Sequence, residues 1–170
     1  MEQKFDFLII GSGIAGMSFA LKVADQGTVA ILSKTQLPEA NTALAQGGIS
    51  SVTNLKIDNF EKHIQDTLIA GDFICDIDAV NQVIKNAPSQ IQQLVDWGVL
   101  FDKNEEGEFD LHREGGHSEH RILHHKDTTG AEVQRALMAK IEAHPNITIF
   151  ENYFGIDLIT QHHLGQLKSI

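Results

Sequence analysis

Three glycines close to the amino terminus constrain the fold of this chain more than any other feature. They form the pattern G-x-G-x-x-G and are Gly11, Gly13 and Gly16. A short apolar run covers residues 5–10, apolar residues then recur at helical spacing over residues 14–24, and a second apolar run covers residues 28–32. This order predicts a strand, a helix and a second, parallel strand joined by a right-handed crossover, and therefore an α/β fold.

Each glycine of the pattern has a physical role at such a turn. Gly11 permits the tight turn, Gly13 lets the backbone approach a pyrophosphate, and Gly16 lets the helix pack on the strand. The amino terminus of the helix offers N–H groups and the positive end of a dipole to phosphates. We therefore predict dinucleotide binding here, rather than only a tight strand-to-helix turn. The predicted contacts are Gly11, Ser12, Gly13, Ile14, Ala15 and Gly16.

The glycine pattern alone does not decide which dinucleotide binds. An acidic residue usually stands about 20 residues further on, at the end of the second strand, where it holds a ribose diol. This sequence has Ser33 there, followed by Lys34. A serine hydroxyl can bond a ribose oxygen, whereas a lysine favours the extra phosphate of NADP. FAD and a nicotinamide dinucleotide therefore both stay open at this point.

Beyond the second strand the sequence predicts a loop followed by helices. Residues 33–52 show no sustained period and are predicted to form an ordered loop. Three helices are expected next: one begins with a capping box at Asp58 and ends at Gly71, one is capped by Asp78, and one begins at Pro88.

The last third of the chain is predicted to hold a polar hairpin or loop, a helix and strands. The polar segment covers residues 102–110, and a capping box of Thr129 and Glu132 opens the helix. Strand residues are expected from Ile147 through residues 154–159, and the chain stops inside the strand-like segment GQLKSI. This ending predicts a piece of a longer protein.

Charge and composition disfavour several classes of partner. The 170 residues carry a formal net charge of −10, which opposes nucleic-acid binding because that depends on Lys and Arg. No stretch approaches the roughly 20 apolar residues of a membrane helix. Cys75 is the only cysteine, so no intrachain disulfide can form. We expect one cytoplasmic domain that binds neither nucleic acid nor membrane.

A second segment with paired glycines identifies the dinucleotide by resemblance. Residues 41–49 read NTALAQGGI, which resembles the second flavin-binding loop of the succinate dehydrogenase and fumarate reductase flavoprotein family. Small residues there let the main chain lie against the isoalloxazine ring of FAD, the alternative being a simple glycine turn. The resemblance implies cofactor contacts from Asn41, Thr42, Ala43, Leu44, Ala45, Gln46, Gly47 and Gly48, and later from Phe154 and Gly155.

Asn41 bears on how the flavin is held. Membrane-bound members of this family carry a histidine at this place that bonds covalently to FAD, and the present sequence has asparagine instead. Because an amide is not a nucleophile, the resemblance implies FAD held without a covalent bond.

Residues 112–118, HREGGHS, with residues 121–130, resemble a stretch typical of the aspartate oxidase branch of the same family. Dehydrogenase and reductase members have an uncharged, usually aromatic residue before the paired glycines, where this sequence has Glu114. Aspartate differs from succinate by one ammonium group, and a carboxylate near the flavin would pair with it. The resemblance implies that Glu114 orients the substrate ammonium, the alternative being a solvated surface glutamate.

Five histidines between residues 112 and 125 raise a zinc site as another alternative. Their spacing matches no usual ligand set, and no cysteine lies nearby. We expect no metal and assign these histidines to hydrogen bonding near the flavin or to the surface.

The resemblance implies an activity and a fold for the whole protein. The activity is oxidation of L-aspartate to iminoaspartate by hydride transfer to FAD, with dioxygen or fumarate as electron acceptor, feeding quinolinate and NAD biosynthesis. The fold is a doubly wound Rossmann-like FAD-binding domain, of which residues 1–170 are the amino-terminal part, without the capping and carboxy-terminal domains. The acid or base residue lies outside this chain, which alone is expected to be inactive and to self-associate through its open sheet edge. A soluble fumarate reductase, a succinate-oxidising relative and an inactive nucleotide-binding fragment stay open as alternatives.

Overall fold

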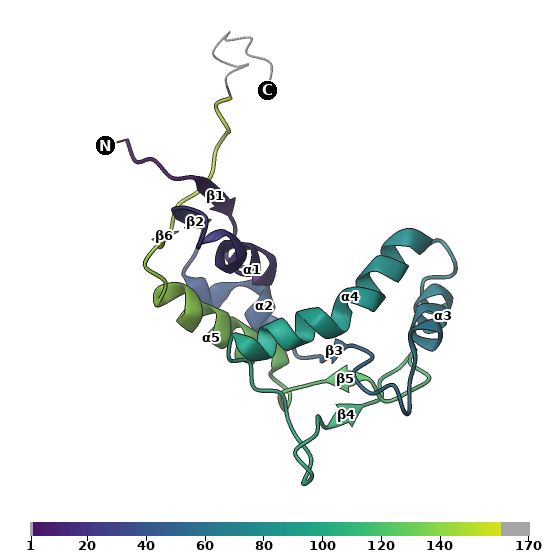
Figure 1. The fold of residues 1–170 in the computed structure, drawn as a ribbon. Coiled ribbons are helices and arrows are strands. Elements are labelled where there is room, and N and C mark those ends of the chain that lie inside the picture. The colour runs from purple at the N-terminus through teal and green to yellow at the C-terminus, as the bar shows by residue number, and fades with distance from the viewer. Residues whose placement is uncertain (1, 161–170) are drawn as a thin grey trace. The chain divides into compact units, whose positions relative to one another are not determined.

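The structure is a computed structural model that describes residues 2–160. The chain divides into two compact units. The first comprises Met1–Leu37 and Ile141–Ile170, and the second comprises Pro38–Lys140 (Figure 1). No helix within the described residues is long and apolar enough to cross a membrane.

A parallel sheet of three strands forms the centre of the first unit. The strands are β1 (Phe7–Ile10), β2 (Val29–Ser33) and β6 (Ile147–Glu151), in the order β1-β2-β6. Helix α1 (Ile14–Val23) connects β1 to β2. Phe7 pairs with Val29, and Val29 in turn pairs with Ile147. The predicted strand, helix and parallel strand at the amino terminus are therefore confirmed.

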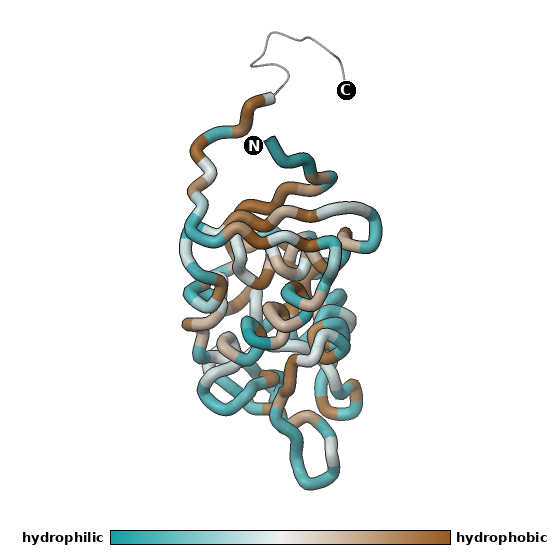
Figure 2. Tube along the Cα trace, turned by 90° about the vertical axis from the view of Figure 1, so that its left-hand side faces the viewer, coloured by the Kyte–Doolittle hydropathy of each residue, from teal (hydrophilic) through white to brown (hydrophobic). Residues whose placement is uncertain are grey.

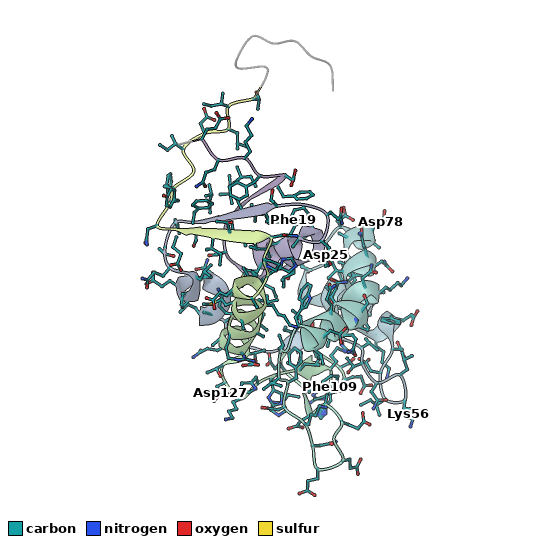
Figure 3. All side chains as sticks on the ribbon, turned by 60° about the vertical axis from the view of Figure 1, so that its left-hand side comes forward. Phe19, Asp25, Lys56, Asp78, Phe109 and Asp127 are labelled. Atoms are coloured by element: carbon teal, nitrogen blue, oxygen red, sulfur yellow. The ribbon has the colours of Figure 1, made fainter. Side chains whose placement is uncertain are left out.

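The sheet is covered by apolar side chains on the face that meets α1. Met17, Ala20 and Val23 of α1 are buried, as is Ile9 of β1. Residues 8 and 10 point to the opposite face because side chains alternate along a strand. Both are large and apolar, yet Leu8 is 53% and Ile10 59% exposed. Figure 2 shows these strands as brown, apolar stretches, and Phe19 of α1 is also half exposed (Figure 3).

The second unit combines helices with a small antiparallel sheet. Its elements are η1 (Leu37–Glu39, which starts at the unit boundary), α2 (Asn41–Leu44), β3 (Ile49–Ser50), α3 (Phe60–Ala70), α4 (Ile77–Asp96), β4 (Leu111–His112), β5 (Ile122–Leu123) and α5 (Thr129–Glu142, which ends in the first unit). The sheet order is β3-β5-β4. The predicted loop at residues 33–52 was therefore wrong in part, because it contains three short elements.

The helix starts differ from the predicted ones by one or two residues. Asn59, not Asp58, caps α3 by accepting a hydrogen bond from the Lys62 N–H at 2.9 Å. Asp76, not Asp78, caps α4 through the Ala79 N–H. In both cases two neighbouring residues have suitable side chains, and the sequence does not distinguish between them.

The two helices expected on either side of Pro88 form one helix, α4, with the proline inside it. Proline lacks an N–H and usually ends or kinks a helix. Here the apolar stripe continues past it, because Ile84, Ile91 and Leu94 are all buried on one face. Burial of that continuous stripe outweighs the lost hydrogen bond.

Predictions for the end of the chain met mixed outcomes. The polar segment 102–110 is a hairpin, with a bridge between Lys103 and Phe109. The apolar stripe of α5 is buried, but its capping box does not form, because the Glu132 carboxylate accepts hydrogen bonds from the Leu100 N–H and from Arg135. Strand β6 ends at Glu151, so the strand expected at residues 154–159 was wrong. The segment GQLKSI lies outside the described residues.

Candidate functional site

The glycine loop of the first unit follows β1 directly. Gly11 has a φ of +110°, a conformation that side chains rarely tolerate, and its N–H donates to the Leu32 carbonyl at 2.9 Å. Gly13 is the N-cap of α1 in extended conformation, and no side chain caps the helix there. A glycine turn at a helix amino terminus fits the phosphate groups of a dinucleotide.

Gly16 is required by packing. A Cβ atom at this position would lie 2.1 Å from the carbonyl oxygen of Gly11 and 3.2 Å from Cγ2 of Ile9. No side chain fits there without moving the helix away from the strand. The steric roles predicted for Gly11 and Gly16 thus agree with the geometry, while contact of residues 11–16 with a pyrophosphate stays a prediction.

The end of β2 holds the residues expected at the ribose. The hydroxyls of Ser12 and Ser33 lie 2.8 Å apart, and both residues are buried. Lys34 follows and is exposed. The Ser33 carbonyl accepts a hydrogen bond from the Tyr153 N–H at 3.0 Å, so the backbone after β6 is tied to the end of β2.

Two later residues expected at the cofactor, Phe154 and Gly155, come directly after Tyr153, whose N–H is bonded to Ser33. Phe154 is 78% exposed. A Cβ atom on Gly155 would meet Ile10 no closer than 3.7 Å, an ordinary contact distance, so packing does not require glycine here. Their role at the cofactor stays a prediction.

The paired glycines of the second unit differ from each other. A Cβ atom on Gly48 would lie 2.3 Å from Cγ2 of Ile122 and 2.4 Å from the Leu123 carbonyl oxygen, whereas a Cβ atom on Gly47 would meet nothing within 4 Å. Position 48 therefore requires glycine, because β5 packs directly against it. Around these glycines the exposed residues are Asn41, Leu44, Ala45, Gln46 and Gly47, and the half-buried ones are Thr42, Ala43 and Gly48.

Gly130 supports the same segment and was not assigned a role from the sequence. Its N–H donates to the Ala45 carbonyl at 2.9 Å, and a Cβ atom would overlap the Thr42 carbonyl oxygen. The first turn of α5 therefore rests directly on α2. The only sequence signal for this contact is the glycine that follows Asp127-Thr128-Thr129 at the start of a helix.

Residues 113–118 form a tight exposed loop after β4. The Glu114 carbonyl accepts a hydrogen bond from the His117 N–H at 3.2 Å, and Gly116 has a φ of +83°. The loop is closed by a hydrogen bond from the Arg121 N–H to the His112 carbonyl at 3.1 Å. Glu114 itself is exposed, so its carboxylate is accessible to a ligand.

A buried arginine anchors this loop. Arg121 has 0% exposure and donates to both carboxylate oxygens of Asp58 at 2.7 and 2.8 Å. It also donates to Asp66 at 2.5 Å. Asp66 in turn accepts from the N–H and the hydroxyl of Ser118, each at 2.8 Å. The ion-pair network thus ties the loop to α3, a role that sequence reasoning missed.

The network shifts the ionisation of its members. Burial raises the pKa of Asp58 and of Asp66, but hydrogen bonds from backbone N–H groups and from Arg121 outweigh it, so that both pKa values lie below the usual range. Burial lowers the pKa of Arg121, and the two carboxylates overcome this and raise it. All three groups are charged at neutral pH.

His63 lies beside this network and behaves differently. Its residue is 4% exposed, and its Nδ1 has no hydrogen-bond partner. Burial, followed by the positive charges of Arg121 and His117, lowers the pKa of His63 to about 4. His63 also lines a hollow of about 250 Å³ that includes Gly115 and Gly116. A neutral imidazole therefore lies next to the loop that carries Glu114.

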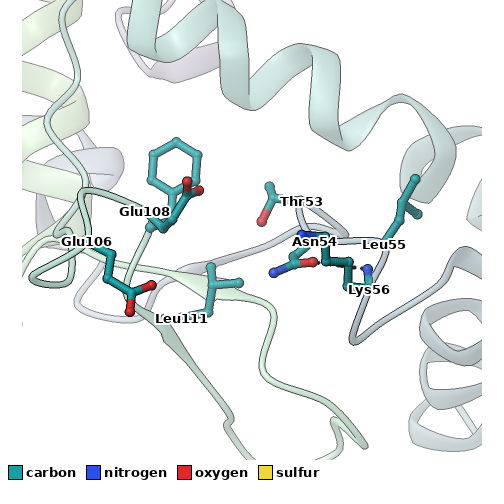
Figure 4. A pocket seen from close by; sticks show the side chains of 8 residues that line it. Thr53, Asn54, Leu55, Lys56, Glu106, Glu108 and Leu111 are labelled. Atoms are coloured by element: carbon teal, nitrogen blue, oxygen red, sulfur yellow. Dashed lines mark hydrogen bonds between the residues drawn. The ribbon is translucent and has the colours of Figure 1, made fainter.

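A surface cleft of about 590 Å³ lies elsewhere in the second unit. Figure 4 shows its lining, with Glu106 and Glu108 on the hairpin and Lys56 on the segment after β3. It shares no residue with the glycine loop, with residues 41–48 or with residues 113–118. We assign it no part in the candidate site.

Comparisons with known proteins agree with the motifs. A family model for the FAD binding domain matches residues 6–167. The chain belongs to this family of FAD-binding domains, and FAD is its cofactor.

Its curated relatives include L-aspartate oxidases. The chloroplastic L-aspartate oxidase 2-b of Nicotiana tabacum is 47% identical over 94% of this chain and 24% of its own length. The L-aspartate oxidase of Yersinia pestis is 48% identical over 96% of this chain and 31% of its own length. This chain thus spans about a quarter to a third of the relatives that it matches.

Among solved structures, an E. coli quinol fumarate reductase is similar with a TM-score of 0.82 and 29% identity, over 87% of this chain and 26% of that one. A quinol-fumarate reductase with menaquinol is similar with a TM-score of 0.84 and 29% identity, over 92% of this chain and 27% of that one.

Proposed function

We propose that the complete protein oxidises L-aspartate to iminoaspartate, with dioxygen or fumarate as electron acceptor, and so feeds quinolinate and NAD biosynthesis. The observation that carries this proposal is the similarity of nearly the whole chain to L-aspartate oxidases, together with Glu114 before the paired glycines. FAD supplies the hydride acceptor, and the residues of this chain hold it and orient the substrate.

Three segments are proposed to divide the contacts with FAD. The N–H groups around Gly13 bind the pyrophosphate, and Ser33 with Lys34 lies at the ribose. The backbone of residues 41–48 faces the isoalloxazine ring, with Gly47 closest to it, because Gly47 has open space around its Cα whereas Gly48 is packed against β5. Phe154 and Gly155 add contacts from the segment that is tied to Ser33.

FAD is proposed to be held without a covalent bond, because Asn41 offers no nucleophile. The test is acid precipitation of the purified protein followed by absorbance spectroscopy. We expect all of the yellow flavin in the supernatant. Flavin that stays in the denatured pellet would contradict the proposal.

Glu114 is proposed to pair with the ammonium group of aspartate. Hydrogen bonds to charged groups contribute about 1.5–3 kcal/mol, so Glu114→Gln in the complete protein is expected to lower kcat/KM for aspartate by roughly 10–150-fold. Fumarate carries no ammonium, and its reduction is expected to change far less. Equal losses with both substrates would rule out this role.

A matched control is available within the same unit. Glu105 is exposed on the hairpin, and Glu105→Gln removes the same charge away from residues 113–118. Its kinetics with aspartate are expected to equal those of the unchanged protein. A comparable loss in both variants would mean that net charge, and not the position of Glu114, causes the effect.

A soluble fumarate reductase or succinate-oxidising enzyme is the second candidate, favoured by the likeness to quinol fumarate reductases. The two functions are separated by comparing turnover of aspartate with turnover of succinate and fumarate in the complete protein. Activity with the dicarboxylates and none with aspartate would select the second candidate.

The sheet is proposed to be one half of a doubly wound Rossmann-like domain, with residues 1–170 as its amino-terminal part. Parallel sheets are normally covered on both faces, and here Leu8 and Ile10 are exposed on one face. Further segments of the complete protein are proposed to cover that face. A cytoplasmic location is proposed for the complete protein. The 170 residues alone are proposed to self-associate there and to be inactive. Peroxide release from aspartate by this chain with added FAD, at the rate of a complete enzyme, would overturn the last point.

A further inference from the structure

Three metal-ligating side chains gather on the small sheet of the second unit, apart from the residues assigned to FAD and substrate. They are Asp110, His112 and His124, and one ligand atom of each lies within 4.8 Å of the others. We propose that these side chains bind a divalent transition-metal ion. Zn²⁺ matches best, since two imidazole nitrogens and one carboxylate oxygen, with a water as fourth ligand, form a usual tetrahedral set.

Strand register brings the three residues together. Leu111 pairs with Leu123 and His112 pairs with Ile122 in the antiparallel ladder of β4 and β5. Continuing that register places residue 110 opposite residue 124. Since residues two apart on a strand share a face, all three side chains project from one face of the ladder. A search for ligand spacing along the sequence could not find this set.

His124 is held in a form suited to metal binding. The residue is 9% exposed, and its Nε2 has no hydrogen-bond partner. Its Nδ1 lies 3.2 Å from an oxygen of Asp102, and that oxygen also accepts the Lys126 N–H at 2.7 Å. A carboxylate at Nδ1 favours the tautomer with its proton there, which leaves the lone pair of Nε2 for a metal. Metal-binding histidines are commonly oriented by such a carboxylate.

The distances around Asp110 also favour a cation. Its Oδ2 lies 3.8 Å from Nε2 of His124 and 3.8 Å from Nε2 of His112. These separations are too long for hydrogen bonds, and two ligand atoms of one tetrahedral zinc ion stand about 3.4 Å apart at the usual bond lengths. A carboxylate oxygen facing a buried imidazole lone pair is an unfavourable arrangement of two acceptors, and either a proton on Nε2 or a cation between the two atoms relieves it.

His112 has to move for the site to close. Its ring is stacked on that of His124, with centroids 3.7 Å apart and an interplanar angle of 29°, so their lone pairs do not converge. The His112 side chain is 57% exposed, which leaves room for its ring to turn toward the ion. Binding therefore replaces a ring stack by two coordinate bonds.

The test is a calorimetric titration of the protein with ZnCl₂ near neutral pH in a buffer that does not bind zinc. We expect one saturable equivalent. Asp110→Asn and His112→Ala change exposed side chains, so folding is preserved, and each is expected to weaken zinc binding at least tenfold. Asp102→Asn, which weakens the contact that orients His124 and also changes the acceptor of the Lys126 N–H, is expected to weaken zinc binding by roughly 10–100-fold. X-ray absorption of the zinc-bound protein is expected to show two imidazole ligands.

The matched control is His120→Ala, which removes an exposed histidine of the same run and is expected to leave zinc binding unchanged. Equal zinc affinity in His112→Ala, Asp110→Asn and the unchanged protein would overturn the proposal, because the metal would then bind adventitiously elsewhere. Absence of saturable binding, or an absorption spectrum without imidazole ligands, would overturn it as well.

Discussion

The glycine loop after β1 and the loop at residues 113–118 reach an ordered conformation by opposite means. The first is made of backbone: Gly11 turns the chain, and Gly16 lets α1 meet β1. The second is anchored by the buried Arg121, which forms ion pairs with two aspartates, Asp58 just before α3 and Asp66 within it. A loop built from local backbone geometry can be read from a short motif, whereas a loop built on a long-range ion-pair network cannot.

Of the substitutions that test this comparison, removal of Arg121 is expected to change the free energy of unfolding most. Arg121→Ala leaves Asp58 and Asp66 as buried or half-buried unpaired charges, and breaking a buried pair costs about 3–5 kcal/mol. The free energy of unfolding, measured with urea, is expected to fall by that amount. As a control, Lys62→Ala breaks the more exposed pair with Glu119 and is expected to cost at most about 1 kcal/mol. Similar losses in the two variants would remove the distinction between the two pairs.

Acid is expected to lower the free energy of unfolding through His63, which lies beside residues 113–118. The folded protein holds the pKa of this histidine near 4, below its ordinary value of 6.5, so the unfolded chain binds its proton first as the pH falls. The stabilisation is complete above pH 6.5 and is lost between pH 6.5 and 4, by up to about 3 kcal/mol.

Urea unfolding at a series of pH values measures this slope, and His63→Gln is expected to abolish it in that range. A slope that persists in the variant would assign the effect to other groups. Asp58 and Asp66 have lowered pKa values and act in a separate range, because their stabilisation is lost only as the pH falls below about 3.8.

The paired glycines of the second unit separate structural from cofactor-binding roles. Gly48 is required by packing against β5, whereas Gly47 is proposed to contact the cofactor. Gly48→Ala forces a Cβ atom against β5 and is expected to cost about 1–3 kcal/mol of stability. Gly47→Ala has open space and is expected to change stability by less than about 0.5 kcal/mol while weakening FAD binding. Urea unfolding and a fluorescence titration with FAD measure the two effects. Unchanged FAD affinity in Gly47→Ala would contradict its proposed place at the ring.

The smallest expected effect lies in the first unit. Ser33→Ala removes the buried hydroxyl pair with Ser12 and is expected to cost about 1 kcal/mol of unfolding free energy. Weaker FAD binding in addition would support contact of Ser33 with the ribose. An effect on stability alone would restrict Ser33 to a structural role.

The sequence predicted the elements whose signals are local. The apolar runs and the helical period around Gly11 led to β1, α1 and β2, because buried parallel strands are continuously apolar. The C-cap at Gly71 was likewise found from one residue. The exact N-caps failed, since Asp58 and Asp78 have the same capping chemistry as the neighbouring Asn59 and Asp76 that are used.

What the sequence could not predict depends on residues that are distant along the chain. Arg121 and Asp58 are 63 residues apart, and neither shows in the sequence that it lies in the interior. The requirement for glycine at position 48 comes from β5, and at position 130 from the backbone of α2. Such contacts are set by the tertiary fold, and only the folded chain reveals them.

The late arrival of β6 has a consequence for how this protein is made. The first unit is discontinuous, and Leu37 is hydrogen-bonded to Glu151 across 114 residues. On the ribosome, β1, α1 and β2 emerge early, yet β2 lacks its second neighbour until the whole intervening segment has been synthesised. Domains generally fold as they emerge, and unpaired strand edges are prone to aggregate. The amino-terminal strands are therefore expected to keep one unpaired edge, that of β2, until β6 has been synthesised.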